Sequence, residues 1–256
     1  ATIAFAIDMM LPAMGQMAID LEPSEPARIS WVILGIFAGL IFGQLVFGPL
    51  SDAIGRRGSI QIGIAIFLIG TGVCALTDSF EVLIAGRVLQ GFGGAATRIV
   101  TQAMVRDRFA GREMARVMSF VMTIFILVPI FAPMIGQVVL WFGNWQMLFV
   151  TLGGFSAIIL GWFSLRQPET LTHRRTITVS HLSEALRTVL TNEQSLRFTL
   201  ATGVSFGGLV SYLSSAQHIF QDIYQTGEWF PVLFGSTAAS IAISSLVNAN
   251  YVRLFG

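Results

Sequence analysis

Eight long apolar stretches run along the chain, separated by polar connections, at roughly 1–19, 31–50, 59–77, 82–104, 117–140, 145–165, 198–216 and 231–248. Each is close to the length of about 20 residues that an α-helix needs to cross the hydrocarbon core of a bilayer. They are too long for membrane β-strands of about ten residues, and they lack the strict alternation of such strands. Only a helix satisfies its own backbone hydrogen bonds over this length in lipid. The pattern therefore predicts eight membrane-spanning helices.

The composition supports an all-α polytopic membrane protein. Hydrophobic residues make up 54% of the 256 residues and charged residues 11%, against about 25% charged residues in an ordinary soluble domain. So much apolar surface cannot be hidden inside a water-exposed particle of this size. The net charge is only +1, and no basic run suits a nucleic-acid duplex. We expect a lipid bilayer as the surroundings and no nucleic-acid partner.

Arginine is distributed unevenly over the connections. Those that follow even-numbered spans contain Arg56, Arg57, Arg106, Arg108, Arg112, Arg116, Arg166, Arg174, Arg175, Arg187, Arg197 and Arg253. The connections that follow odd-numbered spans contain a single arginine, Arg28, together with Asp20, Glu22, Glu25, Asp78, Glu81, Asp222 and Glu228. Because arginine is retained on the cytoplasmic side of a membrane, this asymmetry predicts that the even-numbered connections face the cytoplasm.

The polar segment 167–197 divides the chain into two parts. Six predicted spans precede it in residues 1–166, and two follow in residues 198–256. The stretch Val179–Leu190 has apolar residues at close to helical spacing, which predicts a short surface helix in a cytoplasmic linker. The first span has no charged flank and no signal-peptide pattern, and the chain stops soon after the eighth span. We therefore expect a piece of a longer protein.

The connection after the second span combines glycine, an acid and two arginines in close spacing. It contains Gly48, Asp52, Gly55, Arg56 and Arg57 in the order G-P-L-S-D-A-I-G-R-R. Glycines allow a sharp turn, and the acid can cap a helix or pair with an arginine. Cytoplasmic anchoring would explain the two arginines but not the whole spacing. This segment resembles the signature between helices 2 and 3 of the major facilitator superfamily.

The fourth span carries a second resemblance to that family. Arg87, Gln90 and Gly91 belong to the stretch R-V-L-Q-G-F-G, which is similar to the family's R-x-x-Q-G-x-G pattern. An arginine inside a span should face the bundle interior and be paired, although snorkelling of Arg87 to the interface is an alternative. A dinucleotide-binding interpretation of the glycines fails because no strand precedes them. Arg98 lies about three turns further along and is a further candidate cavity residue.

The fifth span shares part of the antiporter signature G-x-x-x-G-P-x-x-G-G. Pro133 and Gly136 match it, whereas Pro129, Ala132 and Gln137 depart from it. Two prolines four residues apart would also bend any helix, so ordinary kinking is the alternative interpretation.

Helix 1, with D-M-M-L-P from Asp8 to Pro12, and residues 105–113 resemble the bicyclomycin-resistance (Bcr/CflA) branch of drug:proton antiporters. That branch has D-M-Y-L-P, so Met10 replaces a tyrosine. The resemblance implies two six-helix bundles around a central cavity, of which about eight of twelve helices are covered. It implies export of small, mostly hydrophobic drugs in exchange for protons across the bacterial inner membrane. The expected transporter is a monomer without a cofactor, driven by the proton gradient.

Asp8 is the only acid well inside a predicted span. A low-dielectric environment penalises a charged carboxylate, so such an acid can load and release a proton as its access to water changes. We predict that Asp8 binds the proton or the substrate, with Arg87 as its buried partner and Arg98 nearby. The alternative is that Asp8 pairs permanently with Arg87 or Arg98 and only holds helices together.

Asp52, Arg56 and Asp107 are predicted to form a cytoplasmic charge cluster that latches the two halves of the transporter in one state. The alternative is that they are solvated loop charges, each contributing little.

Two other function classes are open from the sequence. The stretch Gly203-Val-Ser205-Phe-Gly207 matches the G-x-S-x-G pattern of serine hydrolases, with His218 as a possible base. It lies inside a span rather than at a strand-to-helix turn, which argues against a hydrolase. A uniporter or passive facilitator of the same fold is the other alternative. The histidines lack metal-ligand spacing, and no phosphate-binding G-x-x-x-x-G-K-[ST] loop occurs. We therefore expect a transporter and not an enzyme.

Overall fold

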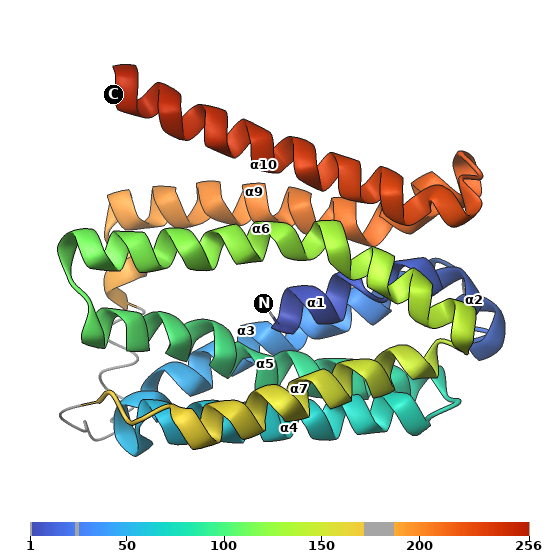
Figure 1. Ribbon diagram of the computed structural model, residues 1–256, viewed down its shortest axis with the longest axis horizontal. Coiled ribbons are helices and arrows are strands. Elements are labelled where there is room, and N and C mark those ends of the chain that lie inside the picture. Colours follow the sequence, from blue (N-terminus) through green and yellow to red (C-terminus); the bar gives the residue numbers. More distant parts are fainter. Residues whose placement is uncertain (1, 24–25, 172–186, 256) are drawn as a thin grey trace.

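The computed structural model describes residues 2–23, 26–171 and 187–255, and within these ranges the regular structure is entirely helical. The long helices are α3 (Trp31–Ile54), α4 (Arg56–Leu76), α5 (Phe80–Arg108), α6 (Gly111–Phe142), α7 (Gln146–Arg166), α9 (Glu193–Gln217) and α10 (Phe230–Phe255). They run side by side along the long axis of the molecule (Figure 1). Every one of the eight predicted spans is helical, which confirms the all-α fold class.

Five described segments are long and apolar enough to cross a membrane by length and composition: Thr2–Leu21, Arg28–Ile54, Arg56–Leu76, Gly111–Phe142 and Gln146–Arg166. Helix α5 is also long enough but carries Arg87 and Arg98 within its length. Most of the predicted surface helix 179–190 lies outside the described residues, and residues 187–191 are helical.

The sequence predicted one continuous helix for the first span, but in the structure this span is interrupted. It consists of α1 (Thr2–Asp8), a turn at Met9 and Met10, a 3-10 turn η1 (Leu11–Ala13) and α2 (Met14–Leu21). Pro12 lies within η1 and has no N–H group to donate to the carbonyl four residues before it. The interruption therefore follows Asp8 directly and places that acid at the end of a helix.

Helix α5 packs against both α3 and α4, and glycines make this close approach possible. A Cβ on Gly39 of α3 would lie 2.0 Å from the carbonyl oxygen of Val88, and a Cβ on Gly91 of α5 would lie 2.0 Å from that of Ile36. Larger side chains at either position would force the two backbones apart. Gly91 therefore has a packing role at the interface between α3 and α5.

The connections gather at opposite ends of the bundle. At one end, Arg56 contacts Asp107, and Arg57 contacts Ser164, so that the start of α4 is joined to the ends of α5 and α7. At the other end, Arg28 bonds Glu81 at 3.1 Å, and the Trp145 indole donates to Asp20 at 3.0 Å. Within the described residues, the arginine-rich connections after the second and fourth predicted spans therefore meet the end of the sixth at one end of the molecule.

Helices α9 and α10 lie on one side of the first six spans. Helix α10 packs along α6, and α9 contacts α3 and η1. Figure 1 shows α10 (red) at the edge of the bundle, with its C-terminal end pointing away from the other helices.

Candidate functional site

Arg87 lies at the centre of a buried polar network on α5. Its side chain is fully buried, and its Nη1 donates to Gln90 Oε1 at 3.0 Å. Gln90 Nε2 in turn donates to Thr71 Oγ1 of α4 at 2.8 Å. We refer to Arg87, Gln90 and Thr71 as the Arg87 network. Its burial excludes the snorkelling interpretation of Arg87, because the guanidinium is directed into the bundle.

Backbone carbonyls of two other helices complete the environment of Arg87. Its Nε donates to the Val32 carbonyl of α3 at 2.8 Å, and Nη1 donates to the Ala6 carbonyl of α1 at 3.2 Å. The guanidinium carbon also lies 5.6 Å from the centroid of the Phe149 ring of α7, within the range of a cation–π contact. Nη2 has no partner among the described residues. Arg87 thus joins its own helix α5 to α1 and α3 through backbone carbonyls and to α7 through the Phe149 ring, and Gln90 extends the network to α4.

Asp8 is buried, with 3% of its surface exposed, at the C-terminal end of α1. No described residue forms an ion pair or a hydrogen bond with its carboxyl group. The prediction that Arg87 is its buried partner is wrong in this structure, because the two bonded nitrogens of Arg87 are directed at carbonyls and at Gln90. The alternative of a permanent Asp8–arginine pair fails for the same reason.

Arg98 lies apart from the Arg87 network. Its side chain is exposed, and its guanidinium carbon lies 5.7 Å from the centroid of the Phe206 ring on α9. Phe206 packs edge-on against Phe37 of α3, with 5.8 Å between the ring centroids. The partner of Arg98, which the sequence left open, is therefore an aromatic ring on a helix that follows the linker.

The predicted charge cluster is assembled at the arginine-rich end. Arg56 Nη1 lies 2.5 Å from Asp52 Oδ1, and Arg56 Nε lies 2.9 Å from Asp107 Oδ2. The same Nη1 donates to Ser51 Oγ at 2.7 Å. Arg56 is itself buried, with 8% of its surface exposed. Isolated solvated charges, the alternative interpretation, do not describe this arrangement.

The cluster connects helices of the first six predicted spans. Asp52, Arg56 and Asp107 belong to α3, α4 and α5, all within the first six spans. Among the described residues, the acids that pair with Arg56 come from these helices and not from α9 or α10. We call these ion pairs a clasp among α3, α4 and α5; the role of the cluster as a latch between states of the transporter stays a prediction.

Glu169, just after α7, is part of this assembly and was missed by the sequence reasoning. Its carboxylate accepts backbone N–H bonds from Arg56 at 3.0 Å and Arg57 at 3.1 Å, the first two residues of α4. It also accepts from the amides of Thr170 at 2.9 Å and Leu171 at 3.0 Å. We call Asp52, Arg56, Asp107 and Glu169 the Arg56 cluster.

The electrostatics of Glu169 are set by these amides. Partial burial of the carboxyl group raises its pKa, but the four backbone hydrogen bonds outweigh that effect and lower the pKa below its ordinary value of 4.5. The unpaired amides at the start of α4 were the available signal, because every helix N-terminus needs acceptors for its first N–H groups.

The remaining residues of this connection have structural roles. Gly55 has a φ of +104°, and a Cβ there would lie 2.5 Å from Glu169 Oε2, so only glycine fits. The Gly48 carbonyl accepts a bond from Ser51 Oγ at 2.8 Å. The Arg57 guanidinium donates to the carbonyl of Ser164 on α7.

On α6, the two residues that match the antiporter signature, Pro133 and Gly136, are buried, and α6 contacts both α1 and η1. A Cβ on Gly136 would lie 2.2 Å from the carbonyl oxygen of Met9, at the interruption of the first span.

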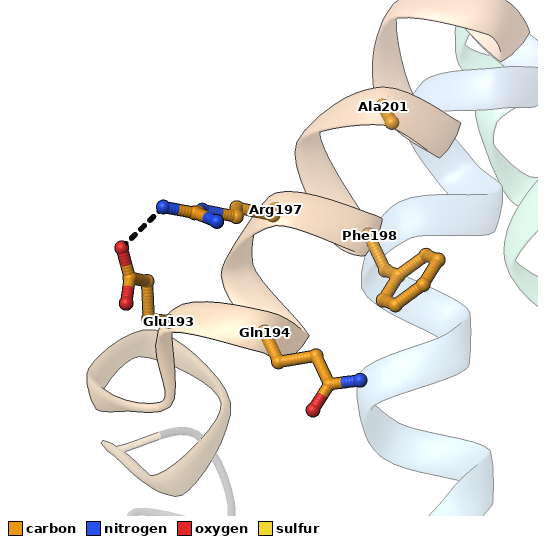
Figure 2. A pocket seen from close by; sticks show the side chains of 5 residues that line it. All are labelled: Glu193, Gln194, Arg197, Phe198 and Ala201. Carbon is orange, nitrogen blue, oxygen red and sulfur yellow. Dashed lines mark hydrogen bonds and ion pairs between the residues drawn. The ribbon is translucent and has the colours of Figure 1, made fainter.

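One pocket of about 580 Å³ is lined by the first turns of α9, but it holds none of the predicted site residues. Figure 2 shows Arg197 paired with Glu193, and Phe198 and Gln194 directed toward a neighbouring helix. Both charged side chains are largely exposed, at 77% and 78%, so their pair contributes little.

The hydrolase and metal alternatives gain no support. Ser205 Oγ donates to the Ala201 carbonyl of its own helix at 3.0 Å, and His218 begins a segment beyond the end of α9. Among the described residues, no group of three or more His, Cys, Asp or Glu side chains could hold a metal ion.

The full chain, residues 1–256, matches the family model described as Major Facilitator Superfamily. It is 32% identical over 246 residues to an uncharacterized MFS-type transporter, YdgK, of Bacillus subtilis, covering 94% of this chain and 61% of that protein. It is 28% identical over 255 residues to a bicyclomycin resistance protein homolog of Haemophilus influenzae, covering 98% and 64%. A multidrug resistance protein MdtL of Escherichia coli is 26% identical over 242 residues, covering 93% and 61%. The chain thus spans about three-fifths of the length of these relatives.

Solved structures share the fold at low sequence identity. A D-xylose-proton symporter superposes with a TM-score of 0.69 at 15% identity, covering 100% of this chain and 67% of that one. The human organic anion transporter MFSD10 superposes with a TM-score of 0.61 at 18% identity, covering 93% and 67%. At these identities the likeness concerns the fold alone.

Proposed function

Because the chain belongs to the major facilitator superfamily, we propose that it forms part of a proton-coupled exporter of small, mostly hydrophobic drug-like compounds. The two relatives named for bicyclomycin resistance and multidrug resistance support this substrate class. The proposed location is the bacterial inner membrane, with the even-numbered connections in the cytoplasm, as the arginine distribution indicates.

The uncompensated burial of Asp8 is the observation that carries the proposal. A carboxyl group enclosed by protein, with no ion pair to a described cation, is stable in its neutral form and costly in its charged form. It therefore binds a proton while enclosed and releases it when a conformational change brings water to it. A substrate that occupies the same space displaces the proton, so that one movement couples the two fluxes.

The proposed energy source is the proton gradient, with no cofactor. The proposed unit is a monomer in which residues 1–166 form a six-helix bundle and residues 167–197 a linker. Residues 198–256 would supply the first two helices of a second bundle. In this arrangement the contact of Arg98 with Phe206 would join the two bundles.

The test is transport of radiolabelled bicyclomycin by the full-length protein in proteoliposomes with an imposed pH gradient. Asp8→Asn keeps the shape of the side chain but cannot exchange a proton, so proton-driven transport should fall to the protein-free background. Glu113→Gln is the matched control, because Glu113 is an exposed acid in the first turn of α6, and it should transport like the wild type.

Two results would count against the proposal. Full proton-driven transport by inserted Asp8→Asn protein would remove the role of Asp8. Transport by the wild type that equilibrates the substrate irrespective of the pH gradient would instead indicate a uniporter or passive facilitator of the same fold.

A further inference from the structure

The interruption of the first span releases two backbone carbonyls beside Asp8. The Met10 amide donates to the Ile7 carbonyl at 3.2 Å, and the Ala13 amide donates to the Met10 carbonyl at 3.0 Å. Both amides thus bond three residues back, whereas an α-helix bonds four residues back. The carbonyls of Ala6 and Met9 are therefore left without these helical donors. One lies two residues before Asp8 and the other directly follows it.

Different helices contact these two carbonyls. Arg87 of α5 donates to the Ala6 carbonyl. Gly136 of α6 lies against the Met9 carbonyl, so closely that an added Cβ would be 2.2 Å from its oxygen and 3.2 Å from its carbon. Contacts under 3.0 Å with backbone atoms do not occur in folded proteins, so α6 can lie here only with glycine at this position. Asp8 therefore lies between two backbone carbonyls, one bonded by Arg87 and the other packed against Gly136.

Helix α6 also packs against α10. A Cβ on Gly235 of α10 would lie 3.3 Å from the carbonyl oxygen of Ile130. Pro129 and Pro133 lie on either side of this contact on α6, and proline removes helical hydrogen bonds and allows bending at that point. Helix α6 thus contacts α10 at Ile130 and the interruption of the first span at Gly136, less than two turns apart.

We propose that Gly136 is a positioning residue for Asp8, through which α6 transmits the movement of α10 to the proton-binding carboxyl group. The inference rests on the proposed function and adds a mechanical link to it. When α10 shifts, α6 bends at its prolines and moves the Met9 carbonyl, and the side chain of the preceding residue, Asp8, moves with it. The acid then changes its access to water without any charged partner.

Among the described residues, Arg87 is a charged side chain that bonds a carbonyl next to the interruption. Helix α9, which contacts η1, carries the titratable Tyr212, whose hydroxyl bonds Thr237. On α6, the stretch from Val117 to Phe142 has no titratable side chain, and α3 has none from Trp31 to Leu50. Arg98, the other arginine inside α5, is directed at Phe206. A change in the titration of Asp8 after a substitution on α6 therefore reports a change of its position or hydration, since α6 brings no charge there.

The experiment compares Gly136→Ala with Gly154→Ala in the full-length protein in proteoliposomes. The infrared band of the protonated Asp8 carboxyl, assigned by its loss in Asp8→Asn, is followed as a function of pH together with the pH profile of bicyclomycin transport. Gly136→Ala should move the midpoint of that titration by about one pH unit or more and displace the transport profile with it. Gly154, on α7, has open space where a Cβ would be added, so Gly154→Ala should match the wild type.

Gly235→Ala provides a second, milder variant should Gly136→Ala fail to insert. Its added Cβ requires the Ile130 carbonyl to yield by only a few tenths of an ångström, so a smaller shift in the same direction is expected. An unchanged Asp8 band in both variants would overturn the proposal. If Asp8→Asn transports normally but Gly136→Ala still moves the band, the positioning role holds and the antiport function fails. If Asp8→Asn is inactive and neither glycine variant moves the band, only the positioning role fails.

Discussion

Arg56 and Arg87 are both buried, yet they are stabilised by different kinds of partner. Arg56 lies at the end of the bundle and contacts two carboxylates, at 2.5 and 2.9 Å. Arg87 lies within the bundle and bonds two backbone carbonyls and an amide oxygen, with no acid. Near water, an ion pair costs little to assemble. Deep in a spanning helix, fixed dipoles satisfy an arginine without requiring a second buried charge.

Because of this difference, the ion pairs of the Arg56 cluster can open during a conformational change, whereas the hydrogen bonds of the Arg87 network cannot. The ion pairs of the Arg56 cluster can exchange with water at the membrane surface, so a conformational change can break them at modest cost. The Arg87 network has no such replacement, because its carbonyls would be left unsatisfied in the interior. It also leaves Asp8 unpaired, since the nearest buried cation has other acceptors.

The largest effect is expected from Arg87→Met. The substitution leaves the Ala6 carbonyl and the Gln90 side-chain oxygen without their donor, and each unsatisfied buried group costs about 1–3 kcal/mol. We therefore expect a loss of about 3 kcal/mol or more in the free energy of unfolding, measured by denaturation in detergent micelles. Arg197→Met is the control, and its exposed pair with Glu193 should contribute less than about 1 kcal/mol. Equal stability of the two variants would show that the carbonyl network contributes nothing.

A smaller and more local effect is expected from Arg56→Glu. It places a third carboxylate beside Asp52 and Asp107 and should loosen the ends of α3, α4 and α5. In protein with Cys74 replaced by alanine, a cysteine at Ser59, which is fully buried near the start of α4, should be labelled several-fold faster by a water-soluble maleimide. The exchange Arg56→Asp with Asp107→Arg should restore slow labelling. Arg106→Glu, a nearby exposed arginine, should leave the rate unchanged, and a rate unaffected by Arg56→Glu would dismiss the clasp.

The smallest effect is expected at Glu169, whose partners are amides rather than charges. Because its pKa in the folded protein lies below 4.5, its ionised form stabilises the folded state fully above that pH. The contribution disappears as the pH falls through the lowered pKa. The Tm of the wild type should therefore fall more steeply below pH 4.5 than that of Glu169→Gln, and Glu113→Gln should behave like the wild type. Parallel curves for wild type and Glu169→Gln would indicate that the helix cap has no energetic role.

Much of the candidate site was visible in residue types and spacing. Asp8 is conspicuous as an acid in an apolar stretch, and Asp52, Arg56 and Asp107 flank spans whose ends must meet at one side of the bundle. The partner of Arg87 was not visible, because hydrogen-bonding carbonyls belong to every residue and carry no signature in the sequence. Pro12 was visible, but whether it bends or interrupts a helix depends on the neighbours that satisfy the released carbonyls.

The sequence by itself determined the helical class and the order of the long helices. These features follow from the length and hydrophobicity of continuous segments, which are local properties. Only the tertiary structure decided that Arg87 meets Ala6 and Val32, that Arg98 meets Phe206, and that Glu169 caps α4. Those contacts join residues far apart in the chain, and they depend on how far each helix is rotated and shifted against its neighbours.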